Sequence, residues 1–125
     1  MNAIRSVIPI TTAADGTATA YSPVLSGKVV SISYVADGTT PYDNTVDFTI
    51  TIESTGQGLW TESNIAAAKT VAPRQATHDQ VGGAALFAAA GAAVRDDIVL
   101  ALDRVKVALV QGGNVKSGSF IVVTA

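Results

Sequence analysis

The segment TVDFTITIES, residues 45–54, places the strongest constraint on how this chain folds. Apolar residues occupy every second position, at Val46, Phe48, Ile50 and Ile52, and polar residues occupy the positions between them, at Asp47, Thr49, Thr51 and Glu53. Side chains that alternate in this way lie on opposite faces of a β-strand. We therefore predict an antiparallel strand whose apolar face lies in a core and whose polar face meets water or a partner.

Further strands are predicted on both sides of this segment. In SGKVVSISYV, residues 26–35, we expect one face to hold Val30, Ile32 and Tyr34 and the other to hold Val29, Ser31 and Ser33. Near the C-terminus, RVKVALV at 104–110 and SFIVVT at 119–124 are rich in the β-branched residues that favour strands. DIVLAL at 97–102 predicts one more short strand, which turns at Asp103.

Glycine-containing turns separate these segments. Asp15–Gly16 and Asp37–Gly38 lie between alternating segments, a pattern that favours β-hairpins. Gly112, Gly113 and Asn114 lie between the last two segments, and Gly and Asn tolerate the positive φ that a tight reversal needs. The following Val-Lys-Ser lacks the glycine that a P-loop places before its lysine, so a phosphate site is excluded. We interpret residues 112–114 as the structural turn of a hairpin.

The segment 63–97 lacks the periodicity of the rest of the chain. Ser63 is suited to cap a short helix, and AALFAAAGAAV at 84–94 has a high helix propensity, but glycines interrupt the segment. We expect a long irregular loop or arm with at most short helical turns. Several apolar residues in it have no period that would place them in the core: Ile65, Val71, Val81, Leu86 and Phe87.

Apolar residues on a long loop either aggregate or bind a partner. We therefore predict that this segment contacts neighbouring chains, with Leu86 and Phe87 as anchors and with Arg74 and His78 as polar contacts at the edge. Trp60, the single Trp of the chain, is a further interface candidate. Aromatic side chains anchor interfaces and carbohydrate sites, and a position in the core is the alternative for Trp60.

Short alternating strands, frequent turns and little helix predict the fold class, an all-β antiparallel β-sandwich, jelly-roll-like, in a single domain of residues 1–125. Charged residues make up 14% of the chain, against about 25% in an ordinary domain. So little charge suggests that part of the surface is buried against other chains, which predicts a homo-oligomer. The net charge is −2 and the basic residues are scattered, so no nucleic-acid partner is predicted. No signal peptide and no apolar run of about 18 residues is evident, so we expect no membrane partner and a protein made in the cytoplasm.

No catalytic, cofactor or metal site is predicted. His78 beside Asp79 resembles a general base, but the chain has no Cys and no G-x-S-x-G motif to activate, so a hydrogen-bonding role in a loop is expected. Glu53 and Glu62 flank a turn as a glycosidase pair might, and an exposed rim is the simpler interpretation. The aspartates lack EF-hand spacing, so no Ca²⁺ site is expected; those considered are Asp37, Asp43, Asp47, Asp96 and Asp97. The chain is therefore not expected to be an enzyme.

Three segments resemble small virion proteins of tailed bacteriophages: DFTITIESTGQGLW at 47–60, PRQATHD at 73–79 and DRVKVALVQGGNVKSGSFIVV at 103–123. Some small β-sandwich proteins of phage heads act as decoration or cement proteins. The resemblance implies a virion structural protein, and a capsid decoration protein that stabilises the head is the first expectation.

Such a protein would bind the major capsid protein on the outer capsid surface of the virion, after assembly in the host cytoplasm. A homotrimer is the favoured oligomer, because three-fold positions recur on icosahedral shells. Two alternatives stay open. One is a structural component of the neck or tail, and the other is a carbohydrate-binding β-sandwich that attaches to the host through Trp60.

Overall fold

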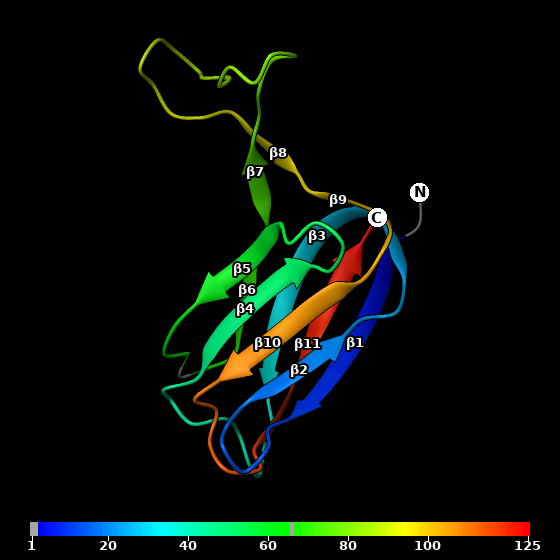
Figure 1. Ribbon diagram of the computed structural model, residues 1–125, viewed down its shortest axis with the longest axis vertical. Helices are drawn as coiled ribbons and strands as arrows, with labels where there is room; N and C mark the ends of the chain where they lie inside the picture. Colours follow the sequence, from blue (N-terminus) through cyan, green and yellow to red (C-terminus); the bar gives the residue numbers. More distant parts are fainter. Residues whose placement is uncertain (1–2, 66) are drawn as a thin grey trace.

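The structure, a computed structural model, describes residues 3–65 and 67–125 and consists of β-strands joined by turns and loops (Figure 1). The strands are β1 (Ile4–Thr11), β2 (Ala18–Tyr21), β3 (Leu25–Ala36), β4 (Asp47–Ile52), β5 (Gly58–Glu62), β6 (Lys69–Val71), β7 (Arg74–Ala76), β8 (Arg95–Asp97), β9 (Val99–Asp103), β10 (Val105–Val110) and β11 (Ser117–Thr124). None of the described residues forms a helix, so none of them belongs to a helix able to cross a membrane.

Two sheets stack to form the body of the protein. The first sheet has the strand order β1-β11-β3-β6, and β9 also pairs with β3; the second has the order β2-β10-β4-β5. All these pairs are antiparallel: β1 with β11, β2 with β10, β3 with β6, and β4 with β5. The first four strands thus pair in reverse order with β5, β6, β10 and β11, as in one long hairpin rolled around a core. This is the connectivity of a jelly roll, which confirms the predicted fold class.

The core lies between the two sheets and follows the alternation of the strands. In β4 the residues Phe48, Ile50 and Ile52 are buried, as the sequence predicts, and β10 and β11 alternate in the same way. Aromatic rings fill the centre, where Phe48 meets Phe120 edge-on with ring centroids 4.8 Å apart. Such edge-to-face pairs add about 0.5–1.5 kcal/mol each beyond the burial of their area.

A bulge in β3 overturns part of the predicted alternation. Val123 pairs with Ser31, but the next residue, Thr124, pairs with Val29, so Val30 is left as an extra residue. The bulge turns Val29 into the core and Val30 to the surface, the opposite of the prediction. A β-bulge shifts the faces of a strand by one residue, and periodicity alone does not show it.

The predicted hairpins at the Asp-Gly and Gly-Gly-Asn turns are wrong. The turn at 14–16 joins β1 to β2, the loop that begins at 37 leads from β3 to β4, and residues 111–116 join β10 to β11. In each case the two strands belong to different sheets. Each of these turns carries the chain from one sheet to the other, because most successive strands of a jelly roll belong to opposite sheets. Among the strands of the body, the directly connected pair β4–β5 does form a hairpin.

The segment 63–97 differs from the irregular arm that was predicted. No helix follows Ser63, although Ala66 in that stretch lies outside the described residues. Strand β6 belongs to the first sheet, and Ile65 is buried in the core, with Val71 packed against it. Strands β7 and β8 form a separate two-stranded ribbon that projects from one end of the sandwich (Figure 1). We call residues 74–97 the arm.

Candidate interaction surfaces: the arm and the outer face of the first sheet

The arm begins as a ribbon and then divides. Beyond β7 and β8, Thr77 donates its backbone N–H to Val94 O at 2.8 Å. Ala85 lies between these two strands, because its N–H donates to Thr77 O and its carbonyl accepts from Val94 N–H, both at 3.0 Å. Two small loops leave this three-way junction, at 78–84 and 86–93. The arm thus has an ordered backbone although it lies away from the core.

A polar network fixes the base of the arm to the body. Asp97 forms ion pairs with Arg74 Nε at 3.2 Å and with Lys28 Nζ on β3 at 3.7 Å. Gln75 Nε2 donates to the backbone carbonyl of Asp97 at 3.1 Å, and Gln57 Nε2 donates to Gln75 Oε1 at 2.8 Å. Arg74, predicted as an interface residue, therefore has an intrachain role at the base of the arm.

His78 and Asp79 begin the first loop of the arm. Asp79 Oδ1 accepts backbone N–H groups from Gly83 at 2.8 Å and Val81 at 3.0 Å, and these bonds lower the pKa of its carboxyl. His78 is exposed and its backbone bridges to Ala84. The carboxylate next to His78 thus closes a turn, and the hydrogen-bonding role expected of the His78 side chain stays a prediction.

The tip of the arm, which we define as residues 80–94, contains no charged residue. The side chains of Val81 and Phe87 are 84% and 77% exposed, and Leu86 is 41% exposed. These three residues lie outside the core, as predicted. Large exposed apolar groups on one projecting segment of a chain are a common mark of a binding surface.

Trp60 does not belong to any exposed surface, which corrects its choice as an interface candidate. It is 7% exposed and packs edge-on against Phe48, with ring centroids 5.5 Å apart. Its Nε1–H donates to Glu62 Oε1 at 2.9 Å, which satisfies the indole at the edge of the core. A carbohydrate site that stacks a sugar on Trp60 is therefore ruled out by its burial in this chain.

The two glutamates have separate cationic partners. Glu53 follows the end of β4 and accepts from Arg104, which lowers the pKa of its carboxyl. Glu62 lies at the end of β5 opposite the start of β4 and accepts from Lys69 Nζ at 2.8 Å and from Trp60; both bonds lower its pKa. They do not form a facing acid pair. Within residues 3–65 and 67–125, no group of three or more His, Cys, Asp or Glu is placed to hold a metal ion.

The predicted turn residues Gly112, Gly113 and Asn114 lie in the loop between the sheets. Gly113 has a φ of +93°, whereas positive φ is not found at Gly112 or Asn114. Gly112 is buried and donates its N–H to Gly16 O at 2.9 Å, while Thr12 Oγ1 donates to Gly113 O at 2.7 Å. These glycines therefore allow two loops at one end of the sandwich to pack closely together.

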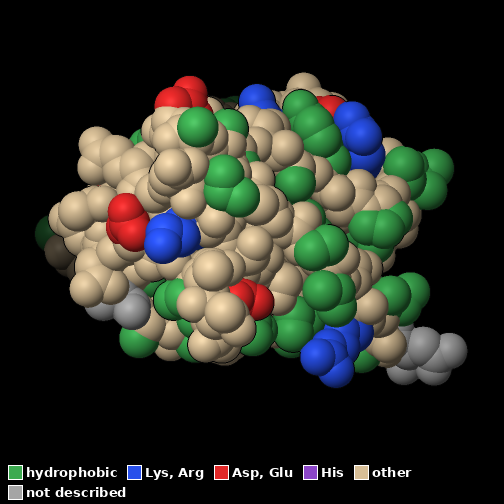
Figure 2. Space-filling view, turned by 90° about the horizontal axis from the view of Figure 1, so that it is seen from below, with side chains coloured by type: hydrophobic (Ala, Val, Ile, Leu, Met, Phe, Trp, Pro, Cys, Tyr) green, Lys and Arg blue, Asp and Glu red, His purple; other side chains and the backbone are tan. Residues whose placement is uncertain are grey.

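The two sheets present different outer faces. The outward residues of β1, β11 and β3 pair in rows such as Val7–Ile121–Ser33 and Pro9–Ser119–Val35, followed by Arg5–Val123–Ser31. Arg5 is the one charged residue in these rows. The outer face of the second sheet is rich in threonine and carries Lys106 and Asp47. Figure 2, which views the end opposite the arm, shows charged side chains as isolated patches among hydrophobic and uncharged ones.

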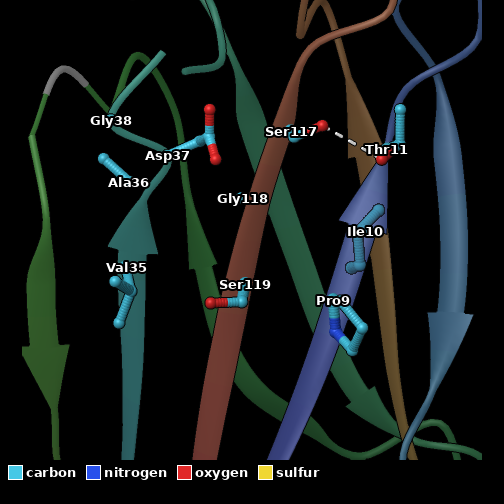
Figure 3. Close-up of a pocket in the computed structure, with 10 residues that line it drawn as sticks. All are labelled: Pro9, Ile10, Thr11, Val35, Ala36, Asp37, Gly38, Ser117, Gly118 and Ser119. Carbon is cyan, nitrogen blue, oxygen red and sulfur yellow. Dashed lines mark hydrogen bonds between the residues drawn. The ribbon is translucent and has the colours of Figure 1, made fainter. Parts of the chain in front are cut away.

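A pocket of about 440 Å³ lies where the outer face of the first sheet reaches this end (Figure 3). Pro9 and Thr11 on β1 and Val35 and Asp37 beside β3 flank a floor of small residues on β11: Ser117, Gly118 and Ser119. Asp37 Oδ2 accepts the N–H groups of Thr40 at 2.7 Å and Thr39 at 3.0 Å, which lower its pKa. The sequence analysis missed this surface, because its members come from three strands whose pairing the sequence does not reveal.

No family model matches the chain, and no curated protein matches it. One solved structure with a similar arrangement is the crystal structure of FLHE. It is 11% identical in sequence, with a TM-score of 0.47, over 99% of this chain and 98% of FLHE. A likeness of this size does not bear on what the chain binds or does.

Proposed function

We propose that the chain is a structural protein of a bacteriophage virion, a decoration protein that binds the outside of the head. The observation that carries the proposal is the arm, which holds Phe87, Val81 and Leu86 in water on an ordered backbone. In a free monomer these side chains lack apolar cover, so they are suited to protein–protein contacts. The resemblance of residues 47–123 to small phage virion proteins agrees with this assignment.

The fold alone does not select this function, because jelly rolls occur in viral capsid proteins, in lectins and in cupins. The described residues favour assembly over catalysis. Glu53 and Glu62 are each paired with a cation, Asp79 closes a turn, and the one His lies beside that Asp79. The low share of charged residues in the chain, 14%, also suits a protein whose surface is largely buried against other chains.

Binding to phage heads tests the proposal. The purified chain is mixed with empty heads of the phage that encodes it, the mixture is sedimented through a cushion, and the pellet is examined. We expect the native chain in the pellet and the double variant Leu86→Asp/Phe87→Asp in the supernatant, with unchanged circular dichroism. The control is Thr19→Asp/Thr49→Asp, which places two charges on the outer face of the second sheet and should still sediment.

Two results would reject the assignment to the head. If the native chain stays in the supernatant at tens of micromolar, it does not decorate heads. If immunogold labelling of intact virions marks the neck or tail, the chain is a component of that structure. A strong signal on a glycan array, combined with no binding to heads, would favour host attachment.

A further inference from the structure

The apolar tip of the arm and the pocket on the first sheet, which is lined by apolar and small polar residues, lie at opposite ends of the molecule. The tip of the arm projects beyond one end of the sandwich, while the pocket on the first sheet lies at the end of β1 and β3 and the start of β11, at the other end (Figure 1, Figure 3). The arm therefore points away from the pocket of its own chain. A contact between the two surfaces must join different copies.

The charges of the two surfaces are compatible with each other. The tip has no ionisable residue, and the rows Val7–Ile121–Ser33 and Pro9–Ser119–Val35 have none either. Burying the tip against these two rows therefore buries no unpaired charge, and burying an unpaired charge would be costly. The outer face of the second sheet is a poorer match, because Lys106 lies in its centre between β2 and β4.

The shapes are compatible as well. Small residues line the floor of the pocket, and the walls contributed by Pro9 and Val35 are apolar. Asp37 at the rim already receives two backbone N–H bonds, so an uncharged segment next to it need not supply a cation. Ala and Gly flank Leu86 and Phe87 along the tip, and small side chains let two backbones approach closely.

We propose that the arm tip of one copy lies on the outer face of the first sheet of a second copy, with Leu86 and Phe87 as the anchors. This inference rests on the proposed role of the arm in assembly and names another copy of the same chain as the partner of the tip, so that the head would be bound by the assembled oligomer. The giving and receiving surfaces differ, so every arm and every face is covered either in a reciprocal pair, where each copy places its arm on the other, or in a closed ring such as a trimer.

The size of the contact favours a closed assembly over a single one-way contact. One buried aromatic side chain contributes about 150–250 Å², whereas a stable interface buries about 800 Å² on each partner. Two anchors on one arm fall short of this area. In a reciprocal pair or a ring each copy both gives an arm and receives one, which doubles the area that each copy buries.

Cysteine cross-linking tests the geometry, because the native chain contains no Cys. Ala88→Cys places a thiol beside Phe87 at the tip, Ser119→Cys places one on the outer face of the first sheet, and Thr49→Cys places one on the second sheet as the control. Two differently tagged variants are mixed, allowed to exchange and treated with a short bis-maleimide. We expect a mixed pair from Ala88→Cys with Ser119→Cys, and a mixed-pair yield at least several-fold lower from Ala88→Cys with Thr49→Cys.

Light scattering measures the oligomer directly. The native chain should be oligomeric at tens of micromolar, and Leu86→Asp/Phe87→Asp should be monomeric with an unchanged circular dichroism spectrum. A monomeric native chain overturns the inference, and so does cross-linking of Ala88→Cys to itself alone or to Thr49→Cys. A monomer that still decorates heads would refute this contact and leave the proposed function standing. An oligomer that forms through this contact but never binds heads would refute the proposed function and leave the contact standing.

Discussion

Gly112 and Gly113 are required for different physical reasons, and the difference can be measured. A Cβ atom on Gly112, whose φ is negative, would lie 2.8 Å from Thr12 Cγ2 and 3.3 Å from Gly16 O. A Cβ atom on Gly113, whose φ is +93°, would lie 2.5 Å from a carboxylate oxygen of Asp43. Thr12 is buried and cannot move aside, whereas Asp43 is exposed and can turn into water. Position 112 therefore requires glycine because there is no room for a Cβ atom beside Thr12, and position 113 requires glycine because its φ is positive.

The two single substitutions should have similar costs. Gly112→Ala overpacks a buried site, which costs about 1–3 kcal/mol of the free energy of unfolding. Gly113→Ala forces a residue with a Cβ into the left-handed region, which costs about 1–2 kcal/mol. Since these ranges overlap, a second substitution is needed to separate the two causes.

Thr12→Ser separates them, because it removes only the methyl group that crowds Gly112. The hydroxyl that donates to Gly113 O at 2.7 Å and accepts from Lys116 N–H at 2.9 Å is kept. We expect Thr12→Ser to rescue Gly112→Ala with a coupling energy of about 1–2 kcal/mol, because the new methyl occupies the space of the lost one. Thr12→Ser and Gly113→Ala should add within about 0.5 kcal/mol.

Urea unfolding monitored by the fluorescence of Trp60 measures these energies, since Trp60 is the single Trp and is buried. Gly56→Ala is the reference for backbone strain alone, because Gly56 has a φ of +73° and a Cβ there meets no atom within 4 Å. A coupling of less than about 0.5 kcal/mol between Thr12→Ser and Gly112→Ala would refute the crowding argument. If Thr12→Ser rescued Gly113→Ala as strongly as it rescues Gly112→Ala, the cost of Gly113→Ala could not be assigned to the positive φ of Gly113.

Three further outcomes are expected. Six carboxyls have pKa values below their ordinary values of 3.8 for Asp and 4.5 for Glu: Asp15, Asp37, Glu53, Glu62, Asp79 and Asp103. The stability that they contribute is therefore complete above about pH 4.5 and is lost as the pH falls through the lowered pKa values. The melting temperature should fall between pH 7 and pH 3, and an unchanged melting temperature would contradict this argument. Tyr42→Phe should cost about 0.5–1.5 kcal/mol in urea unfolding, because it removes the buried hydrogen bond that the Tyr42 hydroxyl donates to Ile10 O at 2.7 Å. Asp97→Ala should speed hydrogen exchange in the arm while the body melts within a few degrees of the native chain, because it removes the partner of Arg74 and Lys28; equal protection of the arm in both proteins would show that this network does not hold it.

Strand identity could be read from the sequence wherever one face of a strand is buried. In β4, burial on one side imposes a period of two, and the sequence shows it at Val46, Phe48, Ile50 and Ile52. The absence of a period likewise placed Leu86 and Phe87 outside the core. The same argument failed at Ile65, an isolated loop residue that is buried although no periodic pattern marks it.

Register and sheet membership could not be read from the sequence. An Asp-Gly pair or a Gly-Gly-Asn triplet indicates that the chain reverses, but the same turn chemistry serves a hairpin and a crossing between sheets. The exchange of Val29 and Val30 depends on a bulge that is set by pairing with β11. Trp60 is a core residue because Phe48 and Phe120 surround it, and these neighbours are remote in the sequence.

The sequence by itself determined the all-β class, the faces of the most regular strands and the uncharged character of the arm, because each of these is a property of neighbouring residues. Tertiary structure decided which strands share a sheet, where the arm departs, and that the outward rows Val7–Ile121–Ser33 and Pro9–Ser119–Val35 of β1, β11 and β3 form one continuous uncharged surface. These features depend on pairs such as Val7 with Ile121, which pairing across the sheet brings together. A surface assembled from distant segments exists only after the chain has folded, so no local sequence pattern can indicate it.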